Sequence, residues 1–251
     1  MHMLVTRIPI FIPVTSLVAM SESSQLALAV HLRDEATLEN FLFADAQLPL
    51  RSMLADQAGP AGEPALYLYG PAGSGRSHLL QAACHGLPAG QALYLPLDEL
   101  QAMDPEAVFA GAEHLTLLAI DNLDAVIGRP EWELALFHLI NRTRAADCRL
   151  LVSAAVAPRQ LGVKLADLQS RLSWGVVFQL PAYSDSEKVE ILQFRAGRRG
   201  MQLSDEAAHY ILARAARSLA DLIALLEQLD RASMVAQRQL SIPFIRATLG
   251  W

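Results

Sequence analysis

Short and almost uninterrupted apolar runs recur along the first two thirds of the chain. They occupy residues 65–69, 92–95, 115–120, 150–153 and 176–180. Runs of this length, without alternation of polar and apolar positions, are typical of strands that are covered on both faces. Segments with helical spacing separate them, at residues 77–85, from 105 onward, at 130–145 and at about 164–172. Because strand and helix alternate, the pattern predicts an α/β fold with a parallel sheet.

The pattern changes after Pro181, beyond which the apolar positions follow helical spacing. Ser184 and Glu187 form the Ser-x-x-Glu signature of a capped helix start, and Gly200 stands where a left-handed residue would end that helix. We expect helices at about 185–199, 204–215, 218–237 and 242–249. The sequence therefore predicts an α/β domain over residues 31–181, followed by a small all-helical lid domain over residues 182–251.

A glycine-rich segment lies between the first predicted strand and the helix after it. It reads Gly70-Pro71-Ala72-Gly73-Ser74-Gly75-Arg76-Ser77. In the Gly-x-x-x-x-Gly-Lys-Ser/Thr pattern, glycines let backbone N–H groups converge on phosphate oxygens at a helix N-terminus. Arg76 stands at the lysine position, and its planar guanidinium differs in shape from a compact ammonium. We expect all eight residues to bind nucleotide, with Arg76 altering nucleotide preference or turnover.

Ser77 and Asp121 are the residues that we expect at a magnesium ion. Ser77 would ligate the ion or support its shell, and Asp121, at the end of the third strand, would hold it through water. Most related ATPases place an acidic residue after this Asp to orient the attacking water, whereas here Asn122 follows and cannot act as a base. Asp124 is interpreted as a solvated or capping loop residue. The sequence thus favours nucleotide binding over hydrolysis.

The composition narrows the classes of partner. The chain has 251 residues, of which 53% are hydrophobic and 18% charged, which indicates a folded protein. Its net charge of −6 disfavours nucleic-acid phosphates as the main ligand, so a protein partner is the first expectation. Cys84 and Cys148 lie far apart and outside any metal-binding spacing, which predicts no disulfide and a cytoplasmic location.

The N-terminal residues 1–24 are expected to form a flexible or wrongly assigned extension. Their apolar stretch, residues 8–20, is interrupted by Pro9 and Pro13 and is too short for the roughly 20 residues of a membrane span. A cleaved signal peptide stays as the alternative for this extension. No membrane partner is expected.

Four segments together resemble the Hda family of the DnaA-related AAA+ ATPases. They are residues 70–80, 120–124, 170–175 (Ser-Arg-Leu-Ser-Trp-Gly) and 228–233 (Gln-Leu-Asp-Arg-Ala-Ser). The resemblance runs from about residue 25 to the C-terminus. It implies an AAA+ nucleotide-binding domain with a helical lid, ADP or ATP with Mg²⁺ as ligand, and DnaA as partner. The family's lid arginine falls at Ala220, with Arg217 one helical turn earlier.

The resemblance also changes the interpretation of Arg171. Without the resemblance, Arg171 would be interpreted as a surface cation and Trp174 as a core anchor. In DnaA relatives the matching arginine is a finger that reaches into the nucleotide site of a neighbouring subunit, so we expect Arg171 to act in trans in catalysis.

Residues 25–30 (Gln-Leu-Ala-Leu-Ala-Val) are similar to the peptide by which the Hda family docks on the DNA polymerase sliding clamp, the β subunit. Gln25 would fill a polar notch, while Leu26, Leu28 and Val30 enter an apolar groove. DnaA continues into a DNA-binding domain, whereas this chain stops soon after the lid, so no sequence-specific DNA binding is expected. Homo-oligomerisation is left open.

These observations lead to three hypotheses. In the first, the chain is a regulator of replication initiation that binds nucleotide and the clamp, and stimulates hydrolysis of DnaA-bound ATP through Arg171. In the second, it is a self-contained AAA+ ATPase that acts as a helicase loader or remodeller. In the third, it is a scaffold for which nucleotide is only a structural ligand.

Overall fold

The computed structural model describes residues 32–33, 35–57, 59–216 and 218–251. The expected N-terminal extension and the clamp-binding peptide, Gln25–Val30, lie outside these residues, as does Arg217. None of the described helices is both long enough and apolar enough to cross a membrane.

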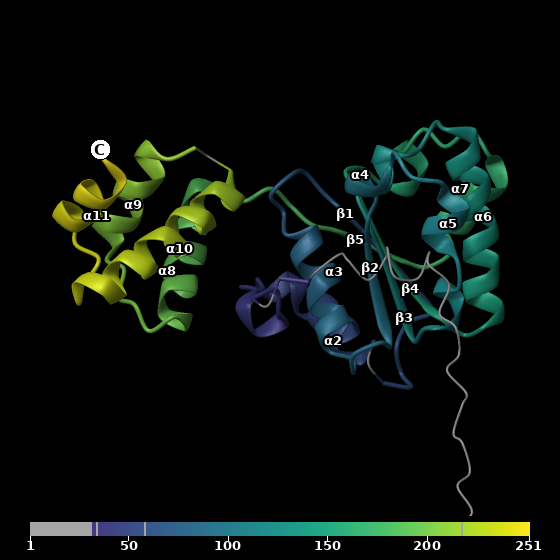
Figure 1. The fold of residues 1–251 in the computed structure, drawn as a ribbon, viewed down its shortest axis with the longest axis horizontal. Coiled ribbons are helices and arrows are strands. Elements are labelled where there is room, and N and C mark those ends of the chain that lie inside the picture. Colours follow the sequence, from purple (N-terminus) through teal and green to yellow (C-terminus); the bar gives the residue numbers. More distant parts are fainter. Residues whose placement is uncertain (1–31, 34, 58, 217) are drawn as a thin grey trace, which may run out of the picture.

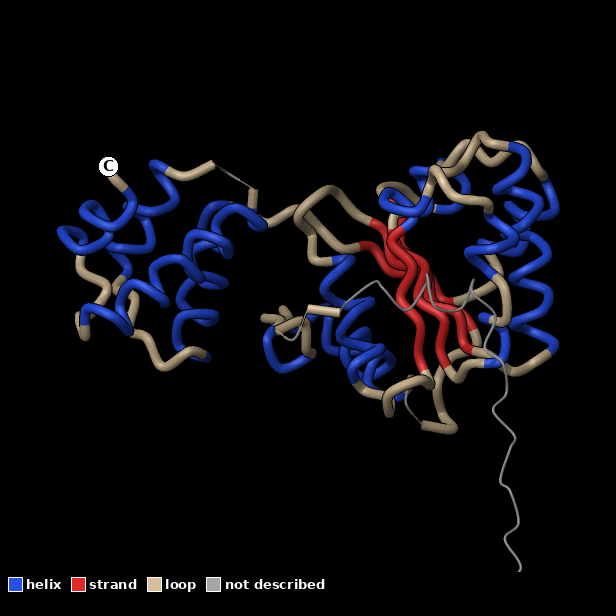
Figure 2. The backbone as a smooth tube through the Cα atoms, viewed as in Figure 1, coloured by secondary structure: helices blue, strands red, loops and turns tan. Residues whose placement is uncertain are grey.

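Five parallel strands form one sheet, which is red in Figure 2. Their order across the sheet is β2-β3-β4-β1-β5. The strands are β1 (Ala65–Tyr69), β2 (Ala92–Pro96), β3 (Leu117–Asp121), β4 (Arg149–Ala154) and β5 (Val176–Gln179). β1 pairs with β4 on one side and with β5 on the other, so that Leu66 lies opposite both Leu151 and Val176. The segment that follows β1 therefore leaves the sheet between two strands from much later in the chain, at the edge where open α/β sheets bind ligands.

Helices cover both faces of the sheet (Figure 1). One layer contains α2 (Leu48–Asp56) and α3 (Arg76–His85), and the other contains α5 (Pro105–Phe109), α6 (Pro130–Ala145) and α7 (Ala166–Leu172), with the single turn α4 (Leu97–Leu100) after β2. Each layer has its own apolar core, in which alternate strand residues face opposite sides: Leu66 and Leu68 pack with α3, whereas Tyr67 packs with α6. This division is the reason that the strand sequences are apolar throughout.

The lid consists of α8 (Asp185–Arg198), α9 (Asp205–Arg214), α10 (Leu219–Ala236) and α11 (Ile242–Leu249), with an apolar core of its own. All four helices begin after a serine whose hydroxyl accepts a backbone N–H from the first turn, at Ser184, Ser204, Ser218 and Ser241. Because each cap satisfies a donor that the helix cannot pair internally, these serines define the helix starts.

The α/β fold with a helical lid confirms the prediction from the sequence. β1 coincides with its apolar run, and the other four strands differ from theirs by one or two residues at one or both ends. β3 begins at Leu117 instead of 115, because the Leu115 N–H closes a 3-10 turn on the Ala112 carbonyl. The sequence did not indicate α2 and α4, which are too short for helical periodicity to separate them from their surroundings.

Candidate nucleotide-binding site

The glycine-rich segment forms the expected strand-loop-helix unit at the carboxyl edge of the sheet. It follows β1, and α3 begins at Arg76. Gly73 and Gly75 have φ angles of +79° and +94°, in the left-handed region that glycine adopts without steric cost. A Cβ at Gly70 would overlap the Leu180 carbonyl oxygen. The backbone of the loop therefore depends on its glycines, and the free N–H groups at the start of α3 are available to phosphate.

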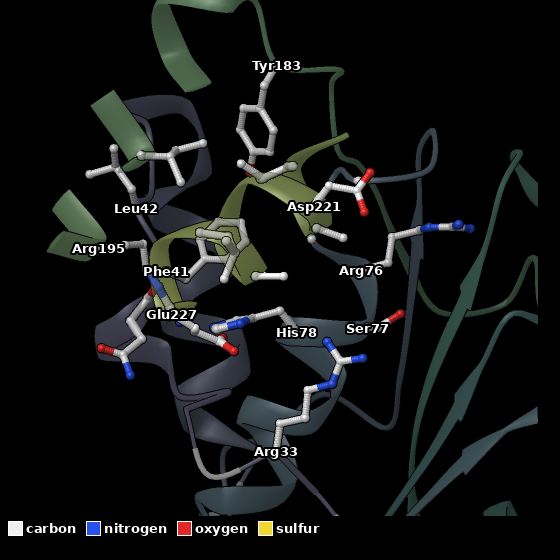
Figure 3. A pocket seen from close by; sticks show the side chains of 18 residues that line it. Arg33, Phe41, Leu42, Arg76, Ser77, His78, Tyr183, Arg195, Asp221 and Glu227 are labelled. Carbon is white, nitrogen blue, oxygen red and sulfur yellow. The ribbon is translucent and has the colours of Figure 1, made fainter. Parts of the chain in front are cut away.

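A cavity of about 610 Å³ opens beside this loop (Figure 3). Three parts of the chain border it: the loop with the start of α3, Arg33 with residues 40–42, and the lid helices α8 and α10 with the linker residue Tyr183. Of the expected nucleotide-binding residues, Gly73, Gly75, Arg76 and Ser77 line the cavity. Ser74 is buried behind it, and its hydroxyl has no hydrogen-bond partner within the described part of the chain. The cavity is large enough for a small organic ligand such as a nucleotide.

Residues 35–43, here called the N-terminal strap, form the second wall. The strap lies against α3, where His78 Nε2 donates to the Thr37 carbonyl at 2.8 Å. Burial lowers the pKa of His78, so the neutral ring is the favoured form. Phe41 packs near His78, with 5.6 Å between ring centroids, and both residues line the cavity. The sequence did not indicate this wall, because its residues have no motif and meet α3 only in the folded chain.

The lid joins the strap through two arginines whose side chains are largely buried. Arg195 on α8 is only 7% exposed, and its guanidinium donates to the Asn40 carbonyl at 2.9 Å and to the Glu35 carboxylate at 2.8 Å. Arg199 also pairs with Glu35 and lies 3.4 Å from Glu227 on α10. Burial lowers the pKa of Arg195, an effect that the nearby Glu35 carboxylate opposes. These ion pairs link the strap to the arginines of α8 and its C-terminal end, and Arg199 in turn links them to α10.

Tyr183, in the linker between β5 and α8, joins the lid to the phosphate loop. Its hydroxyl donates to the Ser74 carbonyl at 3.3 Å. Burial, with a smaller contribution from Glu187, raises the pKa of Tyr183 to about 12, so the hydroxyl stays protonated and able to donate.

The two expected magnesium residues lie on either side of a tyrosine that the sequence did not indicate. Asp121 is fully buried, and its carboxylate accepts from the Tyr94 hydroxyl at 2.6 Å, from the Asn122 N–H at 3.1 Å and from the Ser153 hydroxyl. The Tyr94 hydroxyl also lies near the Ser77 side chain, and burial followed by the Asp121 charge raises the pKa of Tyr94. Tyr94 and Ser153 therefore position the carboxylate that was expected to hold the ion.

These residues fit a magnesium ion that takes most of its ligands from elsewhere. Ser77 and Asp121 supply oxygen, the ligand that Mg²⁺ prefers, and the described residues contain no group of three or more His, Cys, Asp or Glu that could hold a metal. Three donors already occupy the Asp121 carboxylate. Such an ion would depend on phosphate oxygens and water, with Ser77 as the one direct protein ligand and Asp121 as acceptor for a bound water.

Comparison with known proteins shows what this architecture is similar to. The family model described as "Hda, lid domain" matches residues 185–249. An uncharacterized protein of Haemophilus influenzae is 43% identical over 230 residues, which is 90% of this chain and 99% of that protein. Domain III of the replication initiation protein DnaA from Thermotoga maritima superposes with a TM-score of 0.70 at 19% identity, covering 88% of this chain and 98% of that one. The chain belongs to the Hda and DnaA-related AAA+ family.

Other solved structures share the fold, with lower TM-scores. AMPPCP-bound DnaA from Aquifex aeolicus has a TM-score of 0.63 at 20% identity, covering 79% of this chain and 66% of that one. The RuvB Holliday junction branch migration motor of Thermotoga maritima has a TM-score of 0.60 at 21% identity, with 86% and 71% covered. The fold is therefore common to replication initiators and DNA motors, and the site residues must distinguish between functions.

In this Hda and DnaA-related protein, Arg171 lies in the last turn of α7, is half-buried, and does not line the cavity. Trp174 is 44% exposed, with the Arg144 guanidinium 4.4 Å from its ring centroid. The interpretation of Trp174 as a core anchor was therefore wrong. Trp174 lies two residues before β5, which is an edge strand of the described sheet, so the ring packs on an arginine at the surface.

Asn122 and Asp124 follow β3 in different orientations. Asn122 has a left-handed backbone, φ 54°, and its side-chain amide donates to Asp98 at 3.0 Å. The Asp124 carboxylate accepts the Ala155 N–H at 2.8 Å and lies 3.9 Å from an Arg76 nitrogen. Asp124 thus faces the arginine of the phosphate loop, in addition to capping a loop. Spacing alone could not show this, because a 3-10 turn at Leu123–Ala125 sets the direction of the side chain.

Proposed function

We propose that this chain is a regulator of replication initiation that binds an adenine nucleotide and the DNA sliding clamp, and stimulates hydrolysis of DnaA-bound ATP through Arg171. The observation that carries the proposal is the pairing of a phosphate-loop cavity with an Hda lid, in a chain whose Arg171 stands away from that cavity. A residue that does not serve its own nucleotide is available to the nucleotide of another subunit.

The proposed ligand is ADP or ATP with Mg²⁺. Backbone N–H groups at the start of α3 would bind the phosphates, and Phe41 and the lid residues would enclose the base and sugar. A bound magnesium ion would neutralise phosphate charge, with Ser77 and Asp121 as the protein residues that hold it. The DnaA of Aquifex aeolicus was solved with AMPPCP, which supports an adenine nucleotide in a cavity of this fold.

Arg171 is proposed to act on the nucleotide of DnaA. Negative charge develops on the transferred phosphoryl group and the leaving oxygen, and a guanidinium from a neighbouring subunit stabilises that charge. Fingers of this kind change rates by about 10³ to 10⁵. Because Arg171 would act on the ATP bound to DnaA, the chain does not need to hydrolyse its own nucleotide rapidly.

The clamp is proposed to bind residues 25–30, which precede the N-terminal strap. This part of the proposal rests on the peptide pattern of Gln25, Leu26, Leu28 and Val30. A regulator bound to the clamp would stay at the replication machinery, where it would stimulate hydrolysis of the ATP that DnaA holds.

A self-contained ATPase is the second candidate, favoured only by the shared fold with a DNA motor. Against it, the residue after Asp121 is Asn122, whose amide is engaged with Asp98 and has no proton-accepting role. The two candidates differ in which protein hydrolyses ATP.

The deciding experiment measures hydrolysis of ATP bound to DnaA in the presence and absence of this chain, clamp and DNA. We expect stimulation that Arg171→Ala removes and Arg171→Lys restores little, because an ammonium lacks the planar fork of the guanidinium. Arg159→Ala, an exposed arginine in the 3-10 turn before α7, is the matched control and should keep full stimulation. Fast turnover by the chain without DnaA, or full stimulation by a folded Arg171→Ala protein, would contradict the proposal.

A further inference from the structure

Arg76 points away from most of the cavity and toward the end of β3. Its side chain is only 11% exposed, and the nitrogen nearest Asp124 is buried without a hydrogen bond to any described residue. The distance from this nitrogen to the Asp124 carboxylate is 3.9 Å, which is an ion pair but too long for a hydrogen bond. A buried guanidinium nitrogen without a hydrogen bond is costly, so this atom is available to an anion that enters the site.

Asp124 is held in place from two directions. Its carboxylate accepts the Ala155 N–H at 2.8 Å, directly after β4, and its backbone lies in the 3-10 turn after β3. The buried Tyr67 lies near both charges. Burial raises the pKa of Tyr67, the Asp124 carboxylate raises it further, and Arg76 lowers it. The Tyr67 hydroxyl is itself fixed by donation to the Val156 carbonyl at 3.0 Å. The carboxylate is therefore fixed close to Arg76.

This position has a consequence for bound phosphate. In a phosphate loop, the residue at the position of Arg76 reaches the β- and γ-phosphates. A phosphate that binds Arg76 must compete with the Asp124 carboxylate for the guanidinium. A third phosphate adds negative charge on the same side, near a carboxylate that the Ala155 N–H binds in this position.

We propose that Asp124 is a specificity-determining residue, which competes with bound phosphate for Arg76 and disfavours the third phosphate of a nucleoside triphosphate. The inference rests on the nucleotide-binding part of the proposed function and is independent of the clamp and of Arg171. It assigns to the Arg76 and Asp124 pair the choice between diphosphate and triphosphate.

The test compares the affinities of the full chain for ADP and for AMPPCP by calorimetry, with Mg²⁺ and with a chelator. Asp124→Asn removes the charge and keeps an oxygen that can accept the Ala155 N–H. We expect this variant to bind AMPPCP roughly tenfold more tightly than wild type, and ADP less than about threefold more tightly. Asp98→Asn removes a charge from the single-turn helix α4. Asp98 forms no ion pair with Arg76 in the described part of the chain, so the variant should leave the ratio of the two affinities unchanged.

Three results would overturn the inference. Unchanged affinities for both nucleotides in Asp124→Asn would show that the carboxylate does not affect phosphate binding, and equal gains for both nucleotides would show only a general charge effect. A selective loss of AMPPCP affinity in Mg²⁺ would make Asp124 an acceptor for metal-bound water instead. If Asp124→Asn does not fold, Asp124→Ser removes the same charge and also keeps an acceptor oxygen.

Failure of the role proposed for Asp124 and failure of the proposed function would give different experimental results. A wild-type chain that binds neither nucleotide would overturn both the inference and the nucleotide part of the proposal. A chain that binds nucleotide with the expected preference but leaves DnaA-bound ATP unchanged would refute the regulator and leave the role of Asp124 intact.

Discussion

The two sides of the nucleotide cavity are formed by different kinds of group, backbone N–H groups on one side and charged side chains on the other. On the phosphate side, the loop from Gly70 to Ser77 offers backbone N–H groups, and its shape comes from glycines in left-handed conformations. On the opposite side, the N-terminal strap and the lid meet through side-chain charges, in which Arg195 and Arg199 share Glu35. The first side is local in sequence, whereas Arg195 and Glu35 are 160 residues apart.

This difference predicts different responses to substitution. A site made of backbone N–H groups loses its ligand affinity when the backbone conformation is lost, and no side chain can take over the role of those groups. A side-chain network fails in steps, because each ion pair contributes separately and the exposed ones contribute little.

The largest effect is expected for Gly75→Val, which should reduce nucleotide affinity by about 100-fold or more. A β-branched residue is strained at φ +94°, and a Cβ at this position would approach the Phe41 ring to 2.5 Å. The substitution therefore damages both sides of the cavity by displacing Phe41, instead of placing a side chain only in the path of the phosphates. Calorimetry with ADP measures the loss.

Gly90→Val is the matched control for this variant. Gly90 also has a left-handed φ of +81°, but a Cβ there meets nothing within 4 Å. It should share the backbone strain and keep nucleotide affinity. Equal affinity of Gly75→Val and wild type would remove the loop from the site.

An intermediate effect is expected for Arg195→Ala, with a loss of about 1 to 3 kcal/mol in the free energy of unfolding. The variant leaves the Asn40 carbonyl without its donor and removes one of the cations at Glu35, which is itself half-exposed and can be solvated. Denaturant unfolding measures the change.

Arg198→Ala tests whether burial is the reason. Arg198 donates to the side-chain oxygen of the same Asn40 at 3.3 Å, but the Arg198 side chain is exposed. Its loss should cost less than about 0.5 kcal/mol. If the two substitutions cost the same, the buried Arg195 does not hold the lid, and the contrast between the two sides of the cavity is weaker than the geometry implies.

The smallest effect concerns pH. Burial lowers the pKa of His78, so the unfolded chain takes up a proton more readily than the folded chain as pH falls. The stability contributed by neutral His78 is thus fully present above its unfolded pKa of about 6.5 and decreases below that value. His78→Gln keeps a donor for the Thr37 carbonyl and should make stability between pH 7 and 5.5 less dependent on pH. An identical slope for variant and wild type in thermal unfolding would contradict this assignment.

Much of the fold could be predicted from the sequence, because its determinants are local. Continuous apolar runs marked all five strands, and the serine-led helix starts marked the lid, where the Ser184 and Glu187 box forms as expected. The phosphate loop was equally visible, since its glycines are needed wherever a backbone must turn to meet phosphate.

The tertiary structure decided the parts of the site that depend on contacts between distant segments. The sequence could not place Tyr94 between Ser77 and Asp121, bring the strap and α8 together through Glu35 and Arg195, or turn Asp124 toward Arg76. The physical reason is that a charge or hydroxyl has no preferred partner until folding surrounds it with one. The backbone conformation of a glycine loop, by contrast, is determined by its own residues.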